Sequence, residues 1–389
     1  MVEQKKLVEA KSFVTPKKVL FGVGVVEKLA IEAAGLGAKQ ALLVCTPSAV
    51  RNGIAKKLEI SLSKEGIRAC LFDQIGPDPT AAVVDQCTEV ARNNLCDLIV
   101  GVGGGSALDV AKGAAIAAPG QGKFNDLLGR DLTLIKVLPK ILVPTTSGSG
   151  SEVSQAVVFV DKQTGSKFGL HNQCLIADAA IVDPQLVLSL PPSPTADGGL
   201  DAFIHAVEAI LATKATPMSD AVAFEASHLI WGNLKAAFQQ GTDIYARQQV
   251  ALASMMAGMA FTWAGLGAIH ALAYPLNIDC GLSHGRSNAV VCPYVLSFNA
   301  ASCPQKILQL VTALDLDVEE REPGEVLAEA VGEFINQLGI STRLRDYGVS
   351  KTDLPDMAER AVSSGERLLA TNPRPVTVDN ALKIYQQAW

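Results

Sequence analysis

The sequence predicts an α/β dinucleotide-binding domain with a parallel, Rossmann-like sheet over residues 1–190, followed by an all-α domain over residues 191–389. Three observations predict this fold class. The 389 residues exceed what one ordinary core accommodates, so two domains are expected. Strand-like and helix-like segments alternate from about residue 40. The apolar spacing then becomes helical after LSLPPSPTADGG at 188–199, where three prolines and two glycines interrupt the chain.

The first half alternates strands and helices in a regular order. QALLVCT, IRACLFD and DLIVGV are short aliphatic runs typical of buried strands, and helices are expected between them at 49–65 and 80–95. Strand, helix and strand at this spacing predict parallel strands with helices on the faces of the sheet. KILVPTT, SQAVVFVD and AAIVDP extend the strand-rich half.

The second half has the periodicity of helices. In PGEVLAEAVGEFINQLGI the apolar residues fall on one helix face, and Gly339 follows as a stop signal. That face consists of Val326, Leu327, Ala330, Val331, Phe334, Ile335 and Leu338. We therefore expect nearly all of this half to be helical.

Composition narrows the class of protein. Hydrophobic residues make up 49% of the chain, and its net charge of -6 argues against a nucleic-acid partner. The N-terminal MVEQKKLVEAKSF lacks the apolar run of a signal peptide, and no stretch of 18 apolar residues follows. We expect a cytoplasmic protein that does not bind membranes. The eight cysteines include no CxxC pair, so reduced thiols are expected.

A glycine-rich loop follows one predicted strand. LIVGVGGGSALDVAK at 98–112 places Gly103, Gly104 and Gly105 before a helix whose first turn contains Ser106 and Asp109. Glycines let the backbone approach a ligand, and a helix N-terminus offers N–H groups to a phosphate, so the loop predicts a pyrophosphate site. A tight turn with Ser106 as the N-cap stays open as an alternative. PTTSGSGSE at 144–152 is a second candidate loop, since it clusters small hydroxyl residues and glycines.

The segment GLDAFIHAVEAI at 199–210 carries polar residues in a helical pattern. Its apolar stripe contrasts with a second stripe formed by Asp201, His205 and Glu208. A water-facing second stripe is the simpler interpretation and stays open at this point.

Two further histidines, His270 and His284, lie fourteen residues apart with a proline and an expected turn between them. Imidazole nitrogens with one carboxylate form a ligand set for a first-row divalent metal, which Asp201 and His205 would complete. By spacing alone, all four residues also fit ordinary core or surface roles. The sequence offers His171 and His228 no partner pattern, and we expect them to be structural.

Six ordered motifs resemble the iron-dependent (type III) alcohol dehydrogenase family of the dehydroquinate synthase-like superfamily. They are GGGSALDVAK at 103–112, PTTSGSGSEVS at 144–154, AAIVDPQL at 179–186, TADGGLDAFIHAVEA at 195–209, GLGAIHALAYPL at 265–276 and SHGRSNAVVCPYV at 283–295. NPRPVT at 372–377 also resembles the family. The similarity covers nearly the whole chain.

The resemblance implies ligands, cofactors and a reaction. The family's metal ligands fall on Asp201, His205, His270 and His284, for ferrous iron or sometimes zinc or another divalent ion. Its cofactor cleft falls on the glycine loop and on Thr145, Thr146, Ser149 and Lys167, for NAD or NADP. The implied enzyme transfers hydride between a small alcohol, or its aldehyde or ketone, and NAD(P), with the metal lowering the pKa of the alcohol. Members are often dimers or larger, so a homo-oligomer is expected.

Two alternatives to this function remain open. A maleylacetate-reductase-like enzyme needs no metal, but the intact PTTSGSGSE and the metal-ligand pattern argue against it. A nucleotide-binding regulator without turnover is the other alternative, and retention of every candidate ligand argues against that too.

Two positions depart from the family pattern. Thr46 stands where many members carry an aspartate that repels the 2'-phosphate of NADP, so either cofactor is possible, with a slight preference for NAD. Tyr274 stands four residues after His270, where many members have a second histidine near the substrate. We expect Tyr274 on the last turn of its helix, just before Pro275, either in contact with substrate or filling the pocket wall. A tyrosine here is a weak hint of a substrate that carries an acid group.

Overall fold

The computed structural model describes residues 13–132, 135–161 and 167–389. Within these residues, six strands of the N-terminal half form one parallel sheet in the order β1-β8-β5-β4-β2-β3. The strands are β1 (Lys18–Phe21), β2 (Gln40–Cys45), β3 (Arg68–Phe72), β4 (Leu98–Gly103), β5 (Lys140–Pro144) and β8 (Ala179–Val182). β2 and β4 pair in register with Leu43 opposite Val100. Both strands are buried on both faces, which explains their continuous apolar runs.

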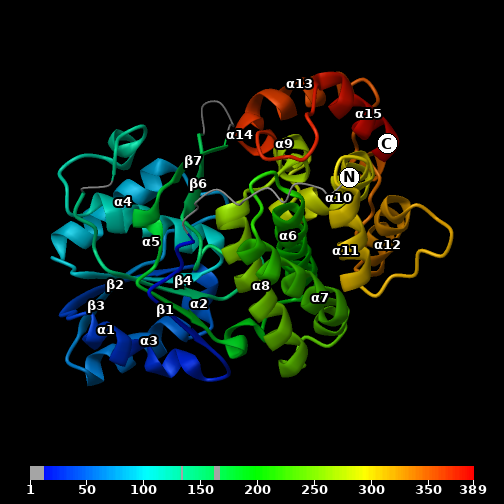
Figure 1. Ribbon diagram of the computed structural model, residues 1–389. Helices are drawn as coiled ribbons and strands as arrows, with labels where there is room; N and C mark the ends of the chain where they lie inside the picture. Colours follow the sequence, from blue (N-terminus) through cyan, green and yellow to red (C-terminus); the bar gives the residue numbers. More distant parts are fainter. Residues whose placement is uncertain (1–12, 133–134, 162–166) are drawn as a thin grey trace, which may run out of the picture.

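Helices cover both faces of this sheet (Figure 1). They are α1 (Leu29–Gly35), α2 (Pro47–Arg51), α3 (Ile54–Lys64), α4 (Ala81–Asn93) and α5 (Gly105–Ala117). Side chains of consecutive strand residues point to opposite faces of the sheet. Leu43 packs in one cluster with α1 and α3, whereas Leu42 packs with α4 and α5. The helix expected at 49–65 is two helices, because Gly53 adopts φ 75° between them.

A separate antiparallel pair stands apart from the six-stranded sheet. β6 (Ala156–Val160), expected from SQAVVFVD, pairs with β7 (Lys167–His171). The sequence did not predict β7 or β1, since both are short and carry or adjoin glycine and lysine. Figure 1 shows the pair between the sheet and the helical half.

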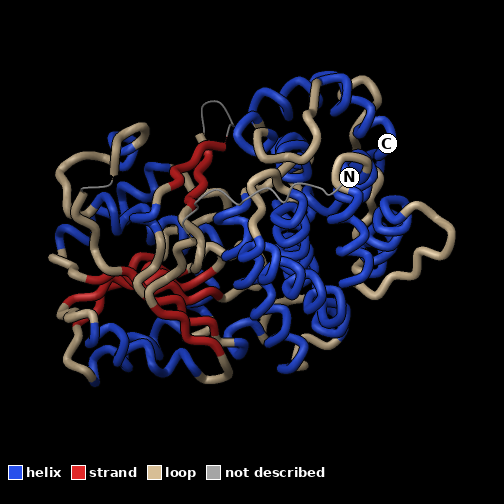
Figure 2. Tube along the Cα trace, viewed as in Figure 1, coloured by secondary structure: helices blue, strands red, loops and turns tan. Residues whose placement is uncertain are grey.

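The C-terminal half is helical, as predicted (Figure 2). Its helices are α6 (Pro192–Leu211), α7 (Pro217–Gln239), α8 (Ile244–Ala264), α9 (Ala268–Asp279), α10 (His284–Ala300), α11 (Pro304–Ala313), α12 (Pro323–Gln337), α13 (Leu354–Ser364), α14 (Glu366–Leu369) and α15 (Val378–Ala388). Short 3-10 helices occur at Val25–Lys28, Phe124–Leu127, Gln173–Leu175, Pro184–Val187 and Leu344–Tyr347. Most of the apolar face predicted for α12 packs in the core, and Gly339 adopts φ 77° after the helix.

Helix α6 begins inside the predicted interruption. Pro192 stands in its first turn, where a proline is tolerated because its missing N–H has no partner there. Gly198 and Gly199 lie within the helix and permit close packing: a Cβ at Gly198 would lie 2.8 Å from the carbonyl oxygen of Ser147. A Cβ at Gly199 would overlap the side chain of Leu234. These glycines therefore mark close contacts rather than a break.

Helix α9 also differs from expectation, because it continues through Pro275 to Asp279. Tyr274 is consequently in the middle of α9 and not on its last turn. In the described part of the chain, no single helix is long and apolar enough to cross a membrane. Helices α8 and α9 would reach that length and composition only as a pair bent by 110°.

Candidate metal and cofactor site

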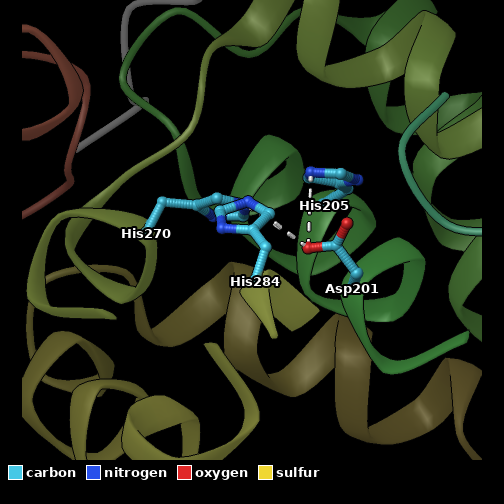
Figure 3. A group of neighbouring side chains, drawn as sticks. All are labelled: Asp201, His205, His270 and His284. Atoms are coloured by element: carbon cyan, nitrogen blue, oxygen red, sulfur yellow. Dashed lines mark ion pairs between the residues drawn. The ribbon is translucent and has the colours of Figure 1, made fainter. Parts of the chain in front are cut away.

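Four side chains from three helices converge at one point (Figure 3). Asp201 and His205 come from α6, His270 from α9, and His284 from the first residue of α10. One donor atom of each lies within 4.8 Å of the others. The Nε2 atoms of the three histidines are each 3.8 Å from Oδ1 of Asp201. The structure thus brings together all four residues that the sequence singled out.

Burial decides between the two interpretations of the second stripe of α6. Helix α6 is buried from Gly199 to Leu211, and its polar stripe contacts His270 on α9 and His284 on α10 instead of water. Asp201, His205 and His270 are 6%, 4% and 2% exposed. The water-facing interpretation is therefore wrong. The side chain of His284 is 39% exposed and gives the cluster one open side.

The donor atoms fit a divalent ion. Two ligand atoms that each lie about 2.1 Å from one ion are separated by about 3 to 4 Å, which matches the separations from Oδ1 of Asp201. Nε2 of His270 is buried and has no hydrogen-bond partner among the described residues. A buried polar atom without a partner is costly unless a ligand or ion satisfies it. Three imidazoles with one carboxylate suit ferrous iron or zinc.

Electrostatics favour the ligand forms of Asp201 and His205. Burial opposes ionisation of Asp201, but the three histidines and a hydrogen bond from Asn288 more than offset it, so the net pKa lies below its ordinary value. Burial lowers the pKa of His205, against the opposing charge of Asp201. A carboxylate and a neutral imidazole are the forms that bind metal.

A glycine lets α10 approach α6 closely enough to place His284. A Cβ at Gly285 would overlap the carbonyl oxygen of Asp197 on α6. Asp197 also anchors the start of α10, because its carboxylate accepts hydrogen bonds from Ser283 Oγ at 2.7 Å and from Arg286 Nε at 3.1 Å. The first turn of α10 is therefore fixed against α6.

Two polar neighbours of the cluster were not assigned a role from the sequence. Asn288 donates to Oδ1 of Asp201 at 2.9 Å and stands four residues after His284, so it shares that residue's helix face. Glu208 belongs to the second stripe of α6, and its Oε2 lies 2.5 Å from Nδ1 of His270. Helical spacing places both on the same faces as ligands, Glu208 one turn after His205 and Asn288 one turn after His284, and is the signal that could have found them.

The loop 144–154 of the N-terminal half contacts the helices of the C-terminal half beside the cluster. The carbonyl oxygen of Gly148 lies 3.2 Å from Nδ1 of His205. A Cβ at Gly148 would lie 2.9 Å from the Cα of Gly198 on α6, and one at Gly150 would lie 2.5 Å from the Cα of Gly258 on α8. Glycine facing glycine therefore allows this loop to lie directly on the helices that carry the cluster.

The glycine loop lies where β4 ends and α5 begins. Gly104 is the N-cap of α5, so Ser106 lies inside the first turn and the alternative with Ser106 as N-cap is wrong. A Cβ at Gly103 would lie 2.6 Å from Thr46 Cγ2, which places Thr46 against this loop. Thr46 is also the N-cap of α2 and bonds Ser48.

The loop 144–154 faces the glycine loop. The N–H of Thr145 donates to the carbonyl oxygen of Gly103 at 2.9 Å. A Cβ at Gly104 would lie 3.3 Å from Thr146 Cγ2, and one at Gly105 would lie 3.0 Å from Ser149. The structure thus gathers these predicted cofactor residues at the carboxyl ends of β2, β4 and β5, the edge where dinucleotides bind in parallel sheets.

Both carboxylate oxygens of Asp109 have partners within the protein. Its Oδ1 accepts from Ser151 Oγ at 2.5 Å and lies 3.2 Å from Nζ of Lys112, and its Oδ2 accepts from the N–H of Val158 at 2.8 Å. Asp109 therefore fastens the loop 144–154 to α5. Lys167 is the first residue of β7, but its side chain lies outside the described part of the structure.

The remaining histidines and Tyr274 lie outside the four-residue cluster. His228 contacts the carbonyl oxygen of Ala313 through Nδ1 at 3.0 Å, in keeping with a structural role, and His171 ends β7. Burial raises the pKa of Tyr274, opposed by the positive charge of Arg367 at α14. The negative charge of Glu208 also raises this pKa, so Tyr274 is a neutral phenol.

Comparison with known proteins gives a consistent result. The family description "Iron-containing alcohol dehydrogenase" matches residues 16–184, and "Fe-containing alcohol dehydrogenase family, C-terminal" matches residues 195–389. Long-chain-alcohol dehydrogenase 1 of Geobacillus thermodenitrificans is 38% identical over 95% of this chain and 94% of its own.

Solved structures agree with the sequence matches. A crystal structure of 1,3-propanediol oxidoreductase superposes with a TM-score of 0.94 at 33% identity, covering 98% of this chain and 100% of the other. Sulfoacetaldehyde reductase from Bifidobacterium kashiwanohense, solved in complex with NAD+, superposes with a TM-score of 0.90 at 27% identity, covering 98% and 99%.

Proposed function

The chain belongs to the iron-containing alcohol dehydrogenase family and is a metal- and NAD(P)-dependent oxidoreductase of CH–OH groups, and we propose that Asp201, His205, His270 and His284 hold its metal ion. The single observation that carries this proposal is the convergence of three imidazole Nε2 atoms at 3.8 Å from one carboxylate oxygen. When bound, iron supplies a Lewis acid that lowers the pKa of an alcohol or polarises a carbonyl.

The cofactor residues divide into two groups in this proposal. Gly103, Gly104, Gly105 and Ser106 hold the pyrophosphate through the first N–H groups of α5, while Thr46 lies beside the ribose. Thr145, Thr146, Ser149 and Lys167 form the neighbouring wall. Asp109 supports that wall by holding the loop 144–154, and bound NAD(P) supplies the hydride acceptor or donor.

The chain's own residues orient the reaction and exclude water from it. The buried α6 fixes two of the four donor side chains, and the loop 144–154 links them to the glycine loop. His284 leaves the open side from which substrate enters, and Tyr274 on α9 lies on the substrate wall. The N-terminal α/β domain at 1–190 therefore binds the cofactor, and the helical domain at 191–389 holds the metal.

The substrate is a small alcohol or its aldehyde, and two classes are favoured. Neutral alcohols and diols are the substrates in the names of the first two relatives described above. Small acidic aldehydes are the second class, because Tyr274 stands where many members have a histidine and a sulfoacetaldehyde reductase shares the fold.

One assay tests the function. Purified enzyme loaded with ferrous iron is mixed with NAD+ or NADP+ and a panel of alcohols, or with the reduced cofactors and neutral, carboxylated and sulfonated aldehydes, and the absorbance of reduced nicotinamide is followed. We expect turnover that a chelator abolishes and that iron restores. Turnover unaffected by complete removal of metal would instead support a maleylacetate-reductase-like enzyme.

Two further expectations are carried forward as proposals. We propose a homo-oligomer, for which the edge strand β1 is the supporting feature, since it pairs with β8 alone within the described residues. Light scattering during size exclusion measures the mass directly. The cytoplasmic location expected from the sequence stays a prediction.

A further inference from the structure

Glu208 is a buried carboxylate one turn beyond His205 on α6. It is 4% exposed and lies among apolar core residues. Its charge is on the same stripe as Asp201 and His205, but Glu208 is not one of the four clustered donors. A buried carboxylate needs partners for both oxygens, so the partners of Glu208 indicate what it does.

Both oxygens of Glu208 contact the start of α9. Oε1 accepts a hydrogen bond from the N–H of Ile269 at 2.6 Å, and Oε2 lies 2.5 Å from Nδ1 of His270. Helix α9 has glycine as its N-cap and so has no side-chain cap of its own. Glu208 therefore caps α9 from another helix and holds the histidine in the same turn.

A second residue completes this cap. Oδ1 of Asn372 accepts a hydrogen bond from the N–H of Ala268 at 3.0 Å, and the next N–H, that of Ile269, donates to Glu208. A Cβ at Gly267 would lie 2.7 Å from Oδ1 of Asn372 and 3.1 Å from Oε1 of Glu208, so glycine is required where both acceptors reach the helix. The start of α9 is thus fixed by two side chains from distant segments.

The contact with Glu208 determines which nitrogen of His270 carries the proton. An ionised carboxylate can only accept, so Nδ1 must be the donor and Nε2 must carry the lone pair. That Nε2 is the buried atom without a hydrogen-bond partner, 3.8 Å from Oδ1 of Asp201. By contrast, the hydrogen-bond partner of His205 Nδ1 among the described residues is a neutral carbonyl, that of Gly148, at 3.2 Å.

We propose that Glu208 is a positioning residue for the metal site: it locks His270 in the Nδ1–H tautomer and aims its Nε2 at the ion. This inference rests on the proposed function, because it takes the four-residue cluster as the metal site. A carboxylate behind a histidine ligand also makes the imidazole a stronger donor. Glu208 acts through His270 and does not touch the ion.

Glu208→Gln tests the proposal with little change in shape. A carboxamide cannot accept from both Ile269 N–H and His270 Nδ1–H. If its oxygen accepts from Ile269, its NH2 group faces Nδ1 and the imidazole proton moves to Nε2, which removes the lone pair. Glu208→Asp is the companion variant, because it keeps a carboxylate, which can accept from Nδ1–H, on a side chain one methylene shorter.

Two measurements give readouts that do not depend on activity. Nitrogen-15 spectra of metal-free, histidine-labelled protein at alkaline pH report the tautomer, with the His270 signals assigned by their loss in His270→Ala. We expect Nδ1–H in the wild type and in Glu208→Asp, and Nε2–H in Glu208→Gln. Competition for zinc with a chromogenic chelator should show about tenfold to hundredfold weaker binding by Glu208→Gln.

Asp183→Asn is the matched control. Asp183 is also a buried carboxylate in the N-terminal half. It accepts hydrogen bonds from the N–H groups of Gly24, Val26 and Gln185. We expect it to lose stability while keeping the His270 tautomer and zinc affinity of the wild type. A Glu208→Gln protein with the Nδ1–H tautomer and unchanged zinc affinity would overturn the proposal. A wild type that binds no metal would overturn the proposed metal site, while the tautomers would still decide whether Glu208 positions His270.

Discussion

The carbonyl oxygen of Gly148, in a loop of the N-terminal half, lies 3.2 Å from Nδ1 of His205 on the central helix of the C-terminal half. The same loop carries Thr145, whose N–H donates to Gly103 of the glycine loop. One short segment therefore contacts both the candidate metal cluster and the candidate pyrophosphate loop. With the metal and cofactor held as proposed, this contact would place them on adjacent surfaces, as hydride transfer requires.

Gly285→Ala should weaken the metal site by steric displacement. The added Cβ overlaps the carbonyl oxygen of Asp197, so the first turn of α10 must move and take His284 with it. We expect a loss of about 1–3 kcal/mol in the free energy of unfolding, typical of overpacking, and weaker zinc binding by chelator competition.

Gly232→Ala is the control for that substitution. Gly232 lies within α7, and its added Cβ would meet nothing within 4 Å. This variant should gain about 0.5–1 kcal/mol of stability from helix propensity and keep its zinc affinity. Equal zinc affinities in the two variants would contradict the proposed role of the close approach at Gly285.

Thr46→Asp should change cofactor preference. Thr46 packs against Gly103 at the carboxyl end of β2, so a carboxylate there would face the ribose and repel a 2'-phosphate. We expect kcat/KM with NADP to fall at least tenfold more than kcat/KM with NAD. Equal effects on both cofactors would mean that Thr46 is not beside the ribose.

Tyr274→Phe should keep turnover within about tenfold of the wild type. A bound metal would already lower the pKa of the alcohol, so general acid-base help is the smaller effect. Burial also raises the pKa of Tyr274, which leaves its phenol neutral at the pH where the enzyme is assayed. Tyr274→His should add or shift an inflection between about pH 6 and 7.5 in the rate profile. A loss of several orders of magnitude in the Phe variant, at unchanged metal content, would show that Tyr274 is essential to proton transfer.

Cys70 should react with alkylating agents at lower pH than an ordinary thiol. Its Sγ lies 3.5 Å from Sγ of Cys96, and that hydrogen bond lowers the pKa of Cys70 below the ordinary value of a thiol. The thiolate is the reactive form, so alkylation of Cys70, followed by peptide mass spectrometry, should have its midpoint at a lower pH than alkylation of an ordinary thiol. Cys96→Ala removes the hydrogen bond and should shift this midpoint upward. An unchanged midpoint in that variant would refute the pairing.

The sequence predicted helices and strands best where the spacing of apolar residues follows directly from which faces of the element are buried. The strands at 40–45 and 98–103 are buried along nearly their whole length, and the helix at 323–337 buries one apolar face, so the apolar spacing predicted all three closely. The family resemblance, confirmed by the comparisons, then picked out four distant residues that the fold does bring together.

The features that the sequence missed depend on contacts between distant segments. Gly198 and Gly199 looked like a break but lie within α6, because their small size serves packing against Ser147 and Leu234. Pro275 looked like a helix end, yet α9 continues past it. The partnership of Glu208 with His270 joins residues 62 positions apart, and helical spacing within one segment says nothing about such a pair.

Metal analysis of the purified protein and of His284→Ala tests the central claim most directly. His228→Ala is the control, since His228 contacts only the Ala313 carbonyl among the hydrogen bonds described for it. We expect about one ion per chain in the wild type and in His228→Ala. His284→Ala should contain far less metal and oxidise alcohol at least roughly a hundredfold more slowly. Wild-type metal content and activity in His284→Ala would contradict the assignment of Asp201, His205, His270 and His284 as the metal site.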